Sequence, residues 1–327
     1  MEILKKLYPF FLVLTLAGCR DELELDDDSA PVMCINSLIK ADEPVSVSVT
    51  HSWFYTDKYA EKDHNVKRAD VRIYANGERV GEDYLPCEGD SVRIVAESTI
   101  YGSAEACVMV PVGVPISSVD WDARVTGETE ELNDGYLTHV YHMDLNARLT
   151  ITDPAGTEDY YQLLYSGFPR AVEDDGRFSL GRLFFEAEPL FSEHVEALYA
   201  LTESVPSMGL FFTDKQFSGQ SYTLNLVFRN MLFKFRDDEC SEDLSDCGLD
   251  LTLSTVSPSY YKWMYYKTYI LDGLISDMSD FGFADPVWGY SNVSTGAGVV
   301  AAISGRSCTI NLRDFLLENC LNAGINP

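Results

Sequence analysis

Two histidines and a nearby carboxylate are the first residues in this sequence whose chemistry suits a reactive site. His139 and His142 stand three positions apart, and Asp144 follows them. Imidazole and carboxylate groups are ligands that Zn²⁺ accepts in proteins. The surrounding residues, however, alternate in the manner of a β-strand, and strand side chains three positions apart point to opposite faces. We therefore predict that these residues do not bind a metal.

The glycine-rich segment Gly296-Ala297-Gly298-Val299-Val300-Ala301 formally matches the fingerprint of dinucleotide-binding folds. That fingerprint belongs after the first strand of a βαβ unit, with an acidic residue about 20 positions later. Here it lies near the end of a β-rich sequence, which favours a turn followed by a strand. The sequence also has no Gly-x-Ser-x-Gly elbow, Walker loop, His-Glu-x-x-His or calcium-loop pattern. We predict a non-enzymatic protein with no catalytic residues, no metal and no cofactor.

Cys19 is the residue best placed for covalent modification. Residues 1–18 contain two lysines and an apolar run that is shorter than the roughly 20 residues of a membrane-spanning helix. This pattern is typical of a signal peptide. Its end, Leu16-Ala17-Gly18-Cys19, resembles the bacterial lipobox, in which the cysteine thiol receives diacylglycerol. We expect an acylated Cys19 to anchor the protein in the outer membrane; the alternative is an ordinary signal peptide that contains a cysteine.

An acidic tether follows the lipidation site in residues 19–30. It begins Arg20-Asp21-Glu22 and contains further acidic residues through Asp28, with no period that would bury one face. The tether resembles the export signal of Bacteroidetes lipoproteins, an acidic cluster directly behind the lipidated cysteine. That resemblance implies display on the cell surface, with Arg20, Asp21 and Glu22 as the signal. The alternative is a charged spacer on the periplasmic side.

Composition limits the partners of the chain. Its 327 residues include 52 acidic and 24 basic side chains, for a net charge of -28. Such a surface repels phosphate backbones and excludes nucleic-acid binding. The eight cysteines include Cys19, and the other seven suit an oxidising compartment, with at most three bridges and an open connectivity. Cys240 and Cys247 bracket a short polar loop, and we expect them to form a local disulfide.

The strand pattern predicts two domains after the tether. In residues 31–118, alternating segments at 46–50, 69–74, 91–96 and 106–111 lie between turn signals. Asn76-Gly77 is a strong hairpin signal. This spacing predicts an immunoglobulin-like β-sandwich. Residues 119–327 predict a larger β-rich domain with one or two short helices, so the fold class is mainly β.

The second domain carries the candidate binding surface. Strands are expected at 141–152, 160–165, 221–235 and 249–256, and a short helix at 191–199. Ser257-Pro258 is typical of a helix start, and we expect the one substantial helix at 260–271. Exposed aromatic rings provide contact area for ligands and partners, so we select Tyr261, Tyr265 and Trp288. The alternative is that these rings fill the core.

Several segments, taken in order, resemble the DUF4249 family of Bacteroidetes outer-membrane lipoproteins. The most specific is Phe283-Ala284-Asp285-Pro286, followed by Ser291-Asn292 and a glycine-rich turn into an apolar strand. The other segments are 87–92, 102–106, 110–111, 153–161 and 212–224. The final strand departs from the family pattern because it lacks the usual phenylalanine after the turn.

The resemblance also implies a role. Members of this family resemble accessory lipoproteins encoded beside TonB-dependent outer-membrane transporters. It therefore implies a transporter as partner and a nutrient of open identity as ligand, which the protein captures or presents. The family offers no catalytic residues to carry over. Two alternatives are a structural or adhesive surface module and a surface hydrolase that acts on the same nutrient.

Overall fold

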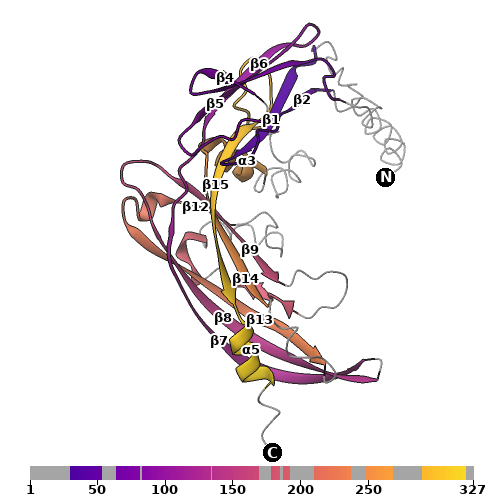
Figure 1. Ribbon diagram of the computed structural model, residues 1–327, viewed down its shortest axis with the longest axis vertical. Helices are drawn as coiled ribbons and strands as arrows, with labels where there is room; N and C mark the ends of the chain where they lie inside the picture. The colour runs from indigo at the N-terminus through magenta and orange to yellow at the C-terminus, as the bar shows by residue number, and fades with distance from the viewer. Residues whose placement is uncertain are drawn as a thin grey trace, which may run out of the picture. The chain divides into compact units, whose positions relative to one another are not determined.

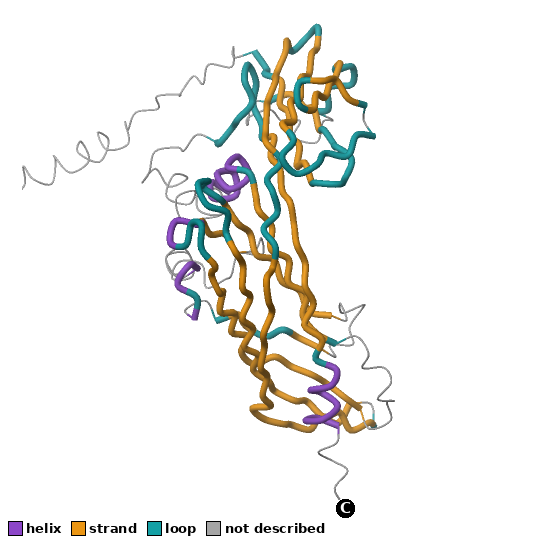
Figure 2. Tube along the Cα trace, turned by 60° about the vertical axis from the view of Figure 1, so that its left-hand side comes forward, coloured by secondary structure: helices purple, strands orange, loops and turns teal. Residues whose placement is uncertain are grey.

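The computed structural model describes residues 30–53, 64–81, 83–133, 135–168, 178–184, 187–191, 210–236, 247–267 and 289–321. The chain divides into two units, and the smaller one comprises residues 1–31 and 53–62. Only Ala30, Pro31 and Trp53 of that unit are described. The larger unit comprises residues 32–52 and 63–327 and contains all the helices and strands that follow. Its described residues are mainly β (Figures 1 and 2), which confirms the predicted fold class.

A four-stranded antiparallel sheet has the order β4-β3-β5-β6. The strands are β3 (Asp70–Ala75), β4 (Glu78–Val80), β5 (Ser91–Ser98) and β6 (Gly102–Met109). The predicted hairpin is confirmed, because Asn76 and Gly77 connect β3 to β4 with φ angles of 51° and 88°. These left-handed conformations are the ones a two-residue hairpin turn requires. Apolar residues alternate along β5, so one face is buried.

A six-stranded sheet has the order β12-β9-β14-β15-β1-β2. The strands are β1 (Met33–Lys40), β2 (Ser48–His51), β9 (Tyr160–Phe168), β12 (Leu210–Thr213), β14 (Gly248–Val256) and β15 (Val300–Asn311). The first and last strands of the described chain pair in parallel, with Ser37 opposite Val300. The sheet therefore runs across the expected division between residues 118 and 119.

The third sheet consists of long strands in the order β10-β13-β8-β7. They are β7 (Ile116–Asn133), β8 (Tyr136–Thr152), β10 (Phe178–Ser179) and β13 (Ser221–Arg236), and β11 (Arg182–Leu183) also pairs with β13. The strands predicted at 141–152, 160–165, 221–235 and 249–256 are thus confirmed as β8, β9, β13 and β14. β7 was not predicted, because its many charged residues obscure the alternation.

Two hydrophobic cores hold these sheets. One combines β1 and β15 with the four-stranded sheet and includes Ile35, Ile94 and Val300. The other combines the six-stranded sheet with the β7-β8-β13 sheet and includes Leu149 and Leu251. Burial of such aliphatic side chains contributes about 1.5–3 kcal/mol each. Residues from the two ends of the chain therefore share one core.

Helical structure is limited among the described residues. α3 (Pro258–Tyr266) is the longest helix, and η2 (Asp214–Gln216), α5 (Arg313–Leu316) and η5 (Leu317–Leu321) are short. The helix expected at 191–199 lies almost wholly outside the described residues. No helix in the described ranges is long and apolar enough to cross a membrane.

The histidine pair, the glycine-rich segment and the described cysteines all lie in ordinary β-strands, turns, loops or helix ends. His139 and His142 lie on β8, where His139 Nδ1 is 2.9 Å from Glu128 and His142 Nδ1 is 2.9 Å from Asn230. The glycine-rich segment is the expected turn into a strand, β15. Contrary to the expected disulfide chemistry, no bridge joins two of the described cysteines. Cys240 lies outside the described residues, so its expected pairing with Cys247 stays a prediction.

Candidate binding pocket

The helix α3 is fastened to the start of β15 by two buried serines. Ser257 Oγ accepts hydrogen bonds from the backbone N–H of Tyr260 at 3.3 Å and of Ala302 at 3.0 Å. Ser259 Oγ donates to the carbonyl of Val300 at 2.9 Å. The helix start predicted at Ser257-Pro258 is therefore confirmed. The serine hydroxyl accepts a hydrogen bond from a free N–H group of the first turn, and proline has no N–H group that would need an acceptor.

One face of α3 forms an aromatic wall. Residues three and four positions apart lie on the same side of a helix, which groups Tyr260, Trp263 and Met264. The Tyr260 and Trp263 ring centroids are 6.3 Å apart. Lys267 Nζ lies 5.7 Å from the Trp263 centroid, within range of a cation–π interaction. Tyr260 and Trp263 thus contact each other at a tilt, and the Lys267 ammonium group lies near the Trp263 ring.

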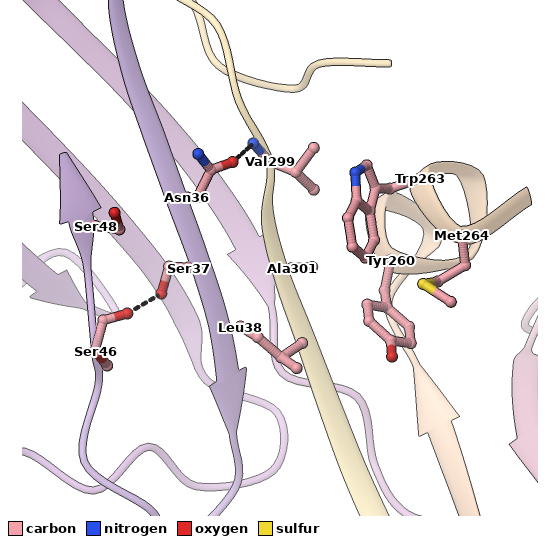
Figure 3. Close-up of a pocket in the computed structure, with 10 residues that line it drawn as sticks. All are labelled: Asn36, Ser37, Leu38, Ser46, Ser48, Tyr260, Trp263, Met264, Val299 and Ala301. Atoms are coloured by element: carbon pink, nitrogen blue, oxygen red, sulfur yellow. Dashed lines mark hydrogen bonds between the residues drawn. The ribbon is translucent and has the colours of Figure 1, made fainter. Parts of the chain in front are cut away.

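The outward face of β1 lies opposite this wall. Asn36 and Leu38 are exposed on β1, between neighbours that point into the core. Asn36 Oδ1 accepts a hydrogen bond from the Val299 N–H at 3.0 Å, and Ser37 Oγ donates to the Ser46 carbonyl at 2.7 Å. Figure 3 shows both bonds, with the Asn36–Val299 bond on the side of β1 that faces α3 and the Ser37–Ser46 bond on its other side. These bonds hold β1 between its two neighbouring chain segments.

The two faces border an open pocket of about 620 Å³. Its lining residues come from β1, from β2 and the segment before it, from α3, and from β15 and the residue before it: Asn36, Ser37, Leu38, Ser46, Ser48, Tyr260, Trp263, Met264, Val299 and Ala301. This volume is in the range of small-molecule sites, which are mainly apolar with a few polar groups.

The lining chemistry is suited to binding. None of the ten lining residues carries a formal charge. Tyr260 is the one titratable group among them; burial raises its pKa above the ordinary tyrosine value, and a hydrogen bond with Gln162 partly offsets that rise. A neutral pocket of aromatic, aliphatic and hydroxyl groups offers no nucleophile with a base beside it. It can hold an uncharged, partly apolar molecule.

Two of the aromatic residues selected from the sequence, Tyr261 and Tyr265, lie on α3 but outside the lining of this pocket. Tyr261 packs against Tyr160 and Phe211, with ring centroids 4.7 and 6.3 Å apart. Tyr265 is 47% exposed. Neither residue lines the cavity. Trp288 lies outside the described residues, as do Cys19, Arg20, Asp21 and Glu22, so the anchor and export signal stay predictions.

Tyr260 and Trp263 are the residues that sequence reasoning missed. Their signal was available, because counting helical positions from the cap at Ser257 separates 260, 263 and 264 from 261 and 265. The sequence did not indicate which of those two faces of the helix packs against the sheet. Leu38 gave no signal at all, because its place opposite the helix depends on a pairing with residues more than 250 positions away.

The pocket lies within the part of the chain that matches a known protein family. The family model for DUF4249, described as a domain of unknown function, matches residues 20–308. The chain belongs to the DUF4249 family. No curated protein and no solved structure matches it. The DUF4249 match includes all ten residues that line the pocket.

Proposed function

We propose that this DUF4249 protein is a non-enzymatic lipoprotein of the outer membrane, displayed on the cell surface, that assists a TonB-dependent transporter. Its task is to capture or present a nutrient. The lipid on Cys19 holds it at the membrane, and the tether that begins Arg20-Asp21-Glu22 directs its export.

The pocket beside α3 is the observation that carries this proposal. Tyr260 and Trp263 offer flat apolar faces, and Asn36, Ser46 and Ser48 add polar groups around them. Aromatic side chains bind apolar or sugar-like faces at low entropic cost. The ligand class that suits this lining is an uncharged molecule with at least one apolar face.

The same lining bears on the two alternatives. A hydrolase needs an acid, base or nucleophile aimed at its substrate, and the ten lining residues provide no paired groups of that kind. A purely adhesive module needs no pocket of about 620 Å³. The cavity therefore favours small-molecule capture over both.

The test is co-purification from outer membranes. The full-length lipoprotein is isolated in mild detergent, and mass spectrometry identifies the small molecules and the membrane proteins that accompany it. We expect a TonB-dependent transporter and an uncharged ligand. Trp263→Ala should reduce ligand recovery at least tenfold, since truncating a binding hot spot costs about 2 kcal/mol or more.

Tyr265→Ala is the matched control, because it removes an exposed aromatic ring from α3 without touching the pocket. It should leave ligand recovery unchanged. Equal recovery from wild type and Trp263→Ala would contradict the proposed role of the pocket. A fall in stability of about 3–5 kcal/mol for Trp263→Ala would instead assign this ring to the core.

A further inference from the structure

Three aspartates from two sheets converge outside the set of residues that line the pocket. Asp153, Asp159 and Asp214 each have a carboxylate oxygen within 4.8 Å of the others. Asp153 and Asp214 are 3% and 2% exposed, and Asp159 is partly buried. The three residues are separate in sequence, which is why no calcium-loop pattern revealed them.

The ends of two strand ladders position these side chains. The β9–β12 ladder ends where Tyr160 pairs with Thr213, so Asp159 and Asp214 follow as neighbours, with a hydrogen bond from the Asp214 N–H to the Asp159 carbonyl at 3.1 Å. The β8–β13 ladder ends at Thr152 and Ser221. The Asp153 N–H then donates to the Gln220 carbonyl at 3.1 Å. The backbone therefore presents all three carboxylates from fixed positions.

The hydrogen bonds at this cluster leave negative charge uncompensated. The Tyr161 hydroxyl and the Gly219 N–H donate to Asp153, and the Thr157 hydroxyl donates to Asp159. No described lysine, arginine or histidine forms a salt bridge with the three aspartates.

Asp214 is the sharpest case within the cluster. Its side chain is almost wholly buried and aimed at the other two carboxylates. Among the described residues, none donates a hydrogen bond to its carboxylate oxygens. A buried carboxylate without hydrogen bond or counter-charge is strongly unfavourable in a folded protein.

We propose that Asp153, Asp159 and Asp214 bind a divalent cation, and that the cation is calcium. Ca²⁺ takes oxygen ligands at about 2.3–2.6 Å, so two ligands on opposite sides of the ion lie roughly 5 Å apart. Oxygens within 4.8 Å of one another suit that sphere. Calcium also tolerates irregular geometry and completes its shell with water, whereas magnesium demands a near-ideal octahedron. The ion clamps the ends of β8, β9 and β12 together.

The direct test uses the wild-type, full-length protein in detergent, stripped with a chelator and titrated with CaCl₂ alone by calorimetry. We expect one site with a dissociation constant between about 10⁻⁴ and 10⁻³ M, as in extracellular calcium modules. At ten times that concentration, the melting temperature should rise by roughly 2–5 °C. MgCl₂ should bind at least tenfold more weakly. The proposal would be overturned if CaCl₂ up to 10 mM, about ten times the upper limit of that range, produced no binding heat and no shift in melting temperature.

Two variants separate a cation site from a merely structural cluster. Asp214→Asn and Asp159→Asn should weaken calcium binding at least tenfold. Without calcium, their melting temperatures should equal or exceed that of wild type, because each removes like-charge repulsion. Asp120→Asn, at an exposed aspartate on β7, is the matched control and should bind calcium normally. Unchanged calcium binding in both site variants would reject the assignment. This test does not depend on the nutrient pocket, so either proposal can fail alone.

Discussion

Ser257 shows how much one side chain decides in this fold. Its single hydroxyl oxygen caps α3 and also accepts the Ala302 N–H of β15. A hydroxyl that is removed from a cap costs about 1 kcal/mol, and here a second buried N–H would lose its partner as well. The side of the helix that meets the sheet is therefore set by a residue outside the pocket.

Cys320 gives a prediction at the same scale. The residue is 1% exposed, and burial raises the pKa of its thiol to about 12, with a further contribution from Glu128. Because the thiolate is the reactive form, Cys320 should resist N-ethylmaleimide in the folded protein at pH 8. The exposed thiols of Cys87 and Cys107 should react within minutes. Mass spectrometry of labelled peptides measures this difference.

The raised pKa of Cys320 also makes the stability of the fold depend on pH. An unfolded cysteine releases its proton near pH 8.5, whereas folded Cys320 holds the proton to about pH 12. The contribution of the buried, protonated Cys320 thiol to the free energy of unfolding is therefore fully present below about pH 8.5, and it is lost as the pH rises toward 12. Urea should make Cys320 as reactive as Cys87. Rapid labelling of Cys320 under native conditions would contradict its placement in the core.

Gly298 fixes the pairing of elements at the turn before β15. Its φ angle is 108°, and a Cβ atom placed there would lie 2.1 Å from the Ile35 carbonyl oxygen. The neighbouring Ala297 carbonyl accepts the Ile35 N–H at 2.9 Å. The backbones of the two chain ends thus approach so closely that only glycine is accommodated.

Gly298→Ala should lower the free energy of unfolding by at least about 2 kcal/mol, through the unfavourable φ angle and the clash with β1. Gly127→Ala is the matched control, because Gly127 lies in β7 with nothing within 4 Å of an added Cβ. That variant should remain within about 0.5 kcal/mol of wild type. Urea denaturation of both variants measures the difference, and equal midpoints would refute the close contact.

We expect the attachment of the whole molecule to the membrane to depend on the proposed lipid anchor at Cys19. Cys19→Ala should prevent lipidation and leave the protein as an uncleaved precursor, because the thiol is the group that receives the lipid. Detergent partitioning and the mass of the N-terminal peptide measure both effects. Cys87→Ala, at an exposed thiol, is the matched control and should be processed normally. A Cys19→Ala protein that still partitions into detergent with a normal mature mass would reject the lipoprotein assignment.

We predict that export to the cell surface is a separate step that depends on the acidic tether. Replacing both Asp21 and Glu22 with alanine should leave lipidation intact and retain the protein on the periplasmic side. Protease digestion of intact cells measures the exposed fraction. Unchanged digestion of the double variant would reduce the tether to a spacer.

Local patterns in the sequence were enough to predict much of the secondary structure of this protein. Alternation in β5, β8 and β14, the Asn76-Gly77 turn and the Ser257-Pro258 helix start were all readable, because each depends on neighbours within a few residues. The family was also readable, from the order of short segments along nearly the whole chain.

Which strands pair, and which residues meet at the two candidate sites, could be read only from the three-dimensional structure. The parallel pairing of β1 with β15, the choice of Tyr260 and Trp263 over Tyr261 and Tyr265, and the convergence of three aspartates all depend on contacts between residues far apart in sequence. No local pattern encodes such contacts, since they follow from how whole sheets pack. The physical reason is that a strand specifies its own faces but not its neighbour, and both proposed sites lie where separate strands meet.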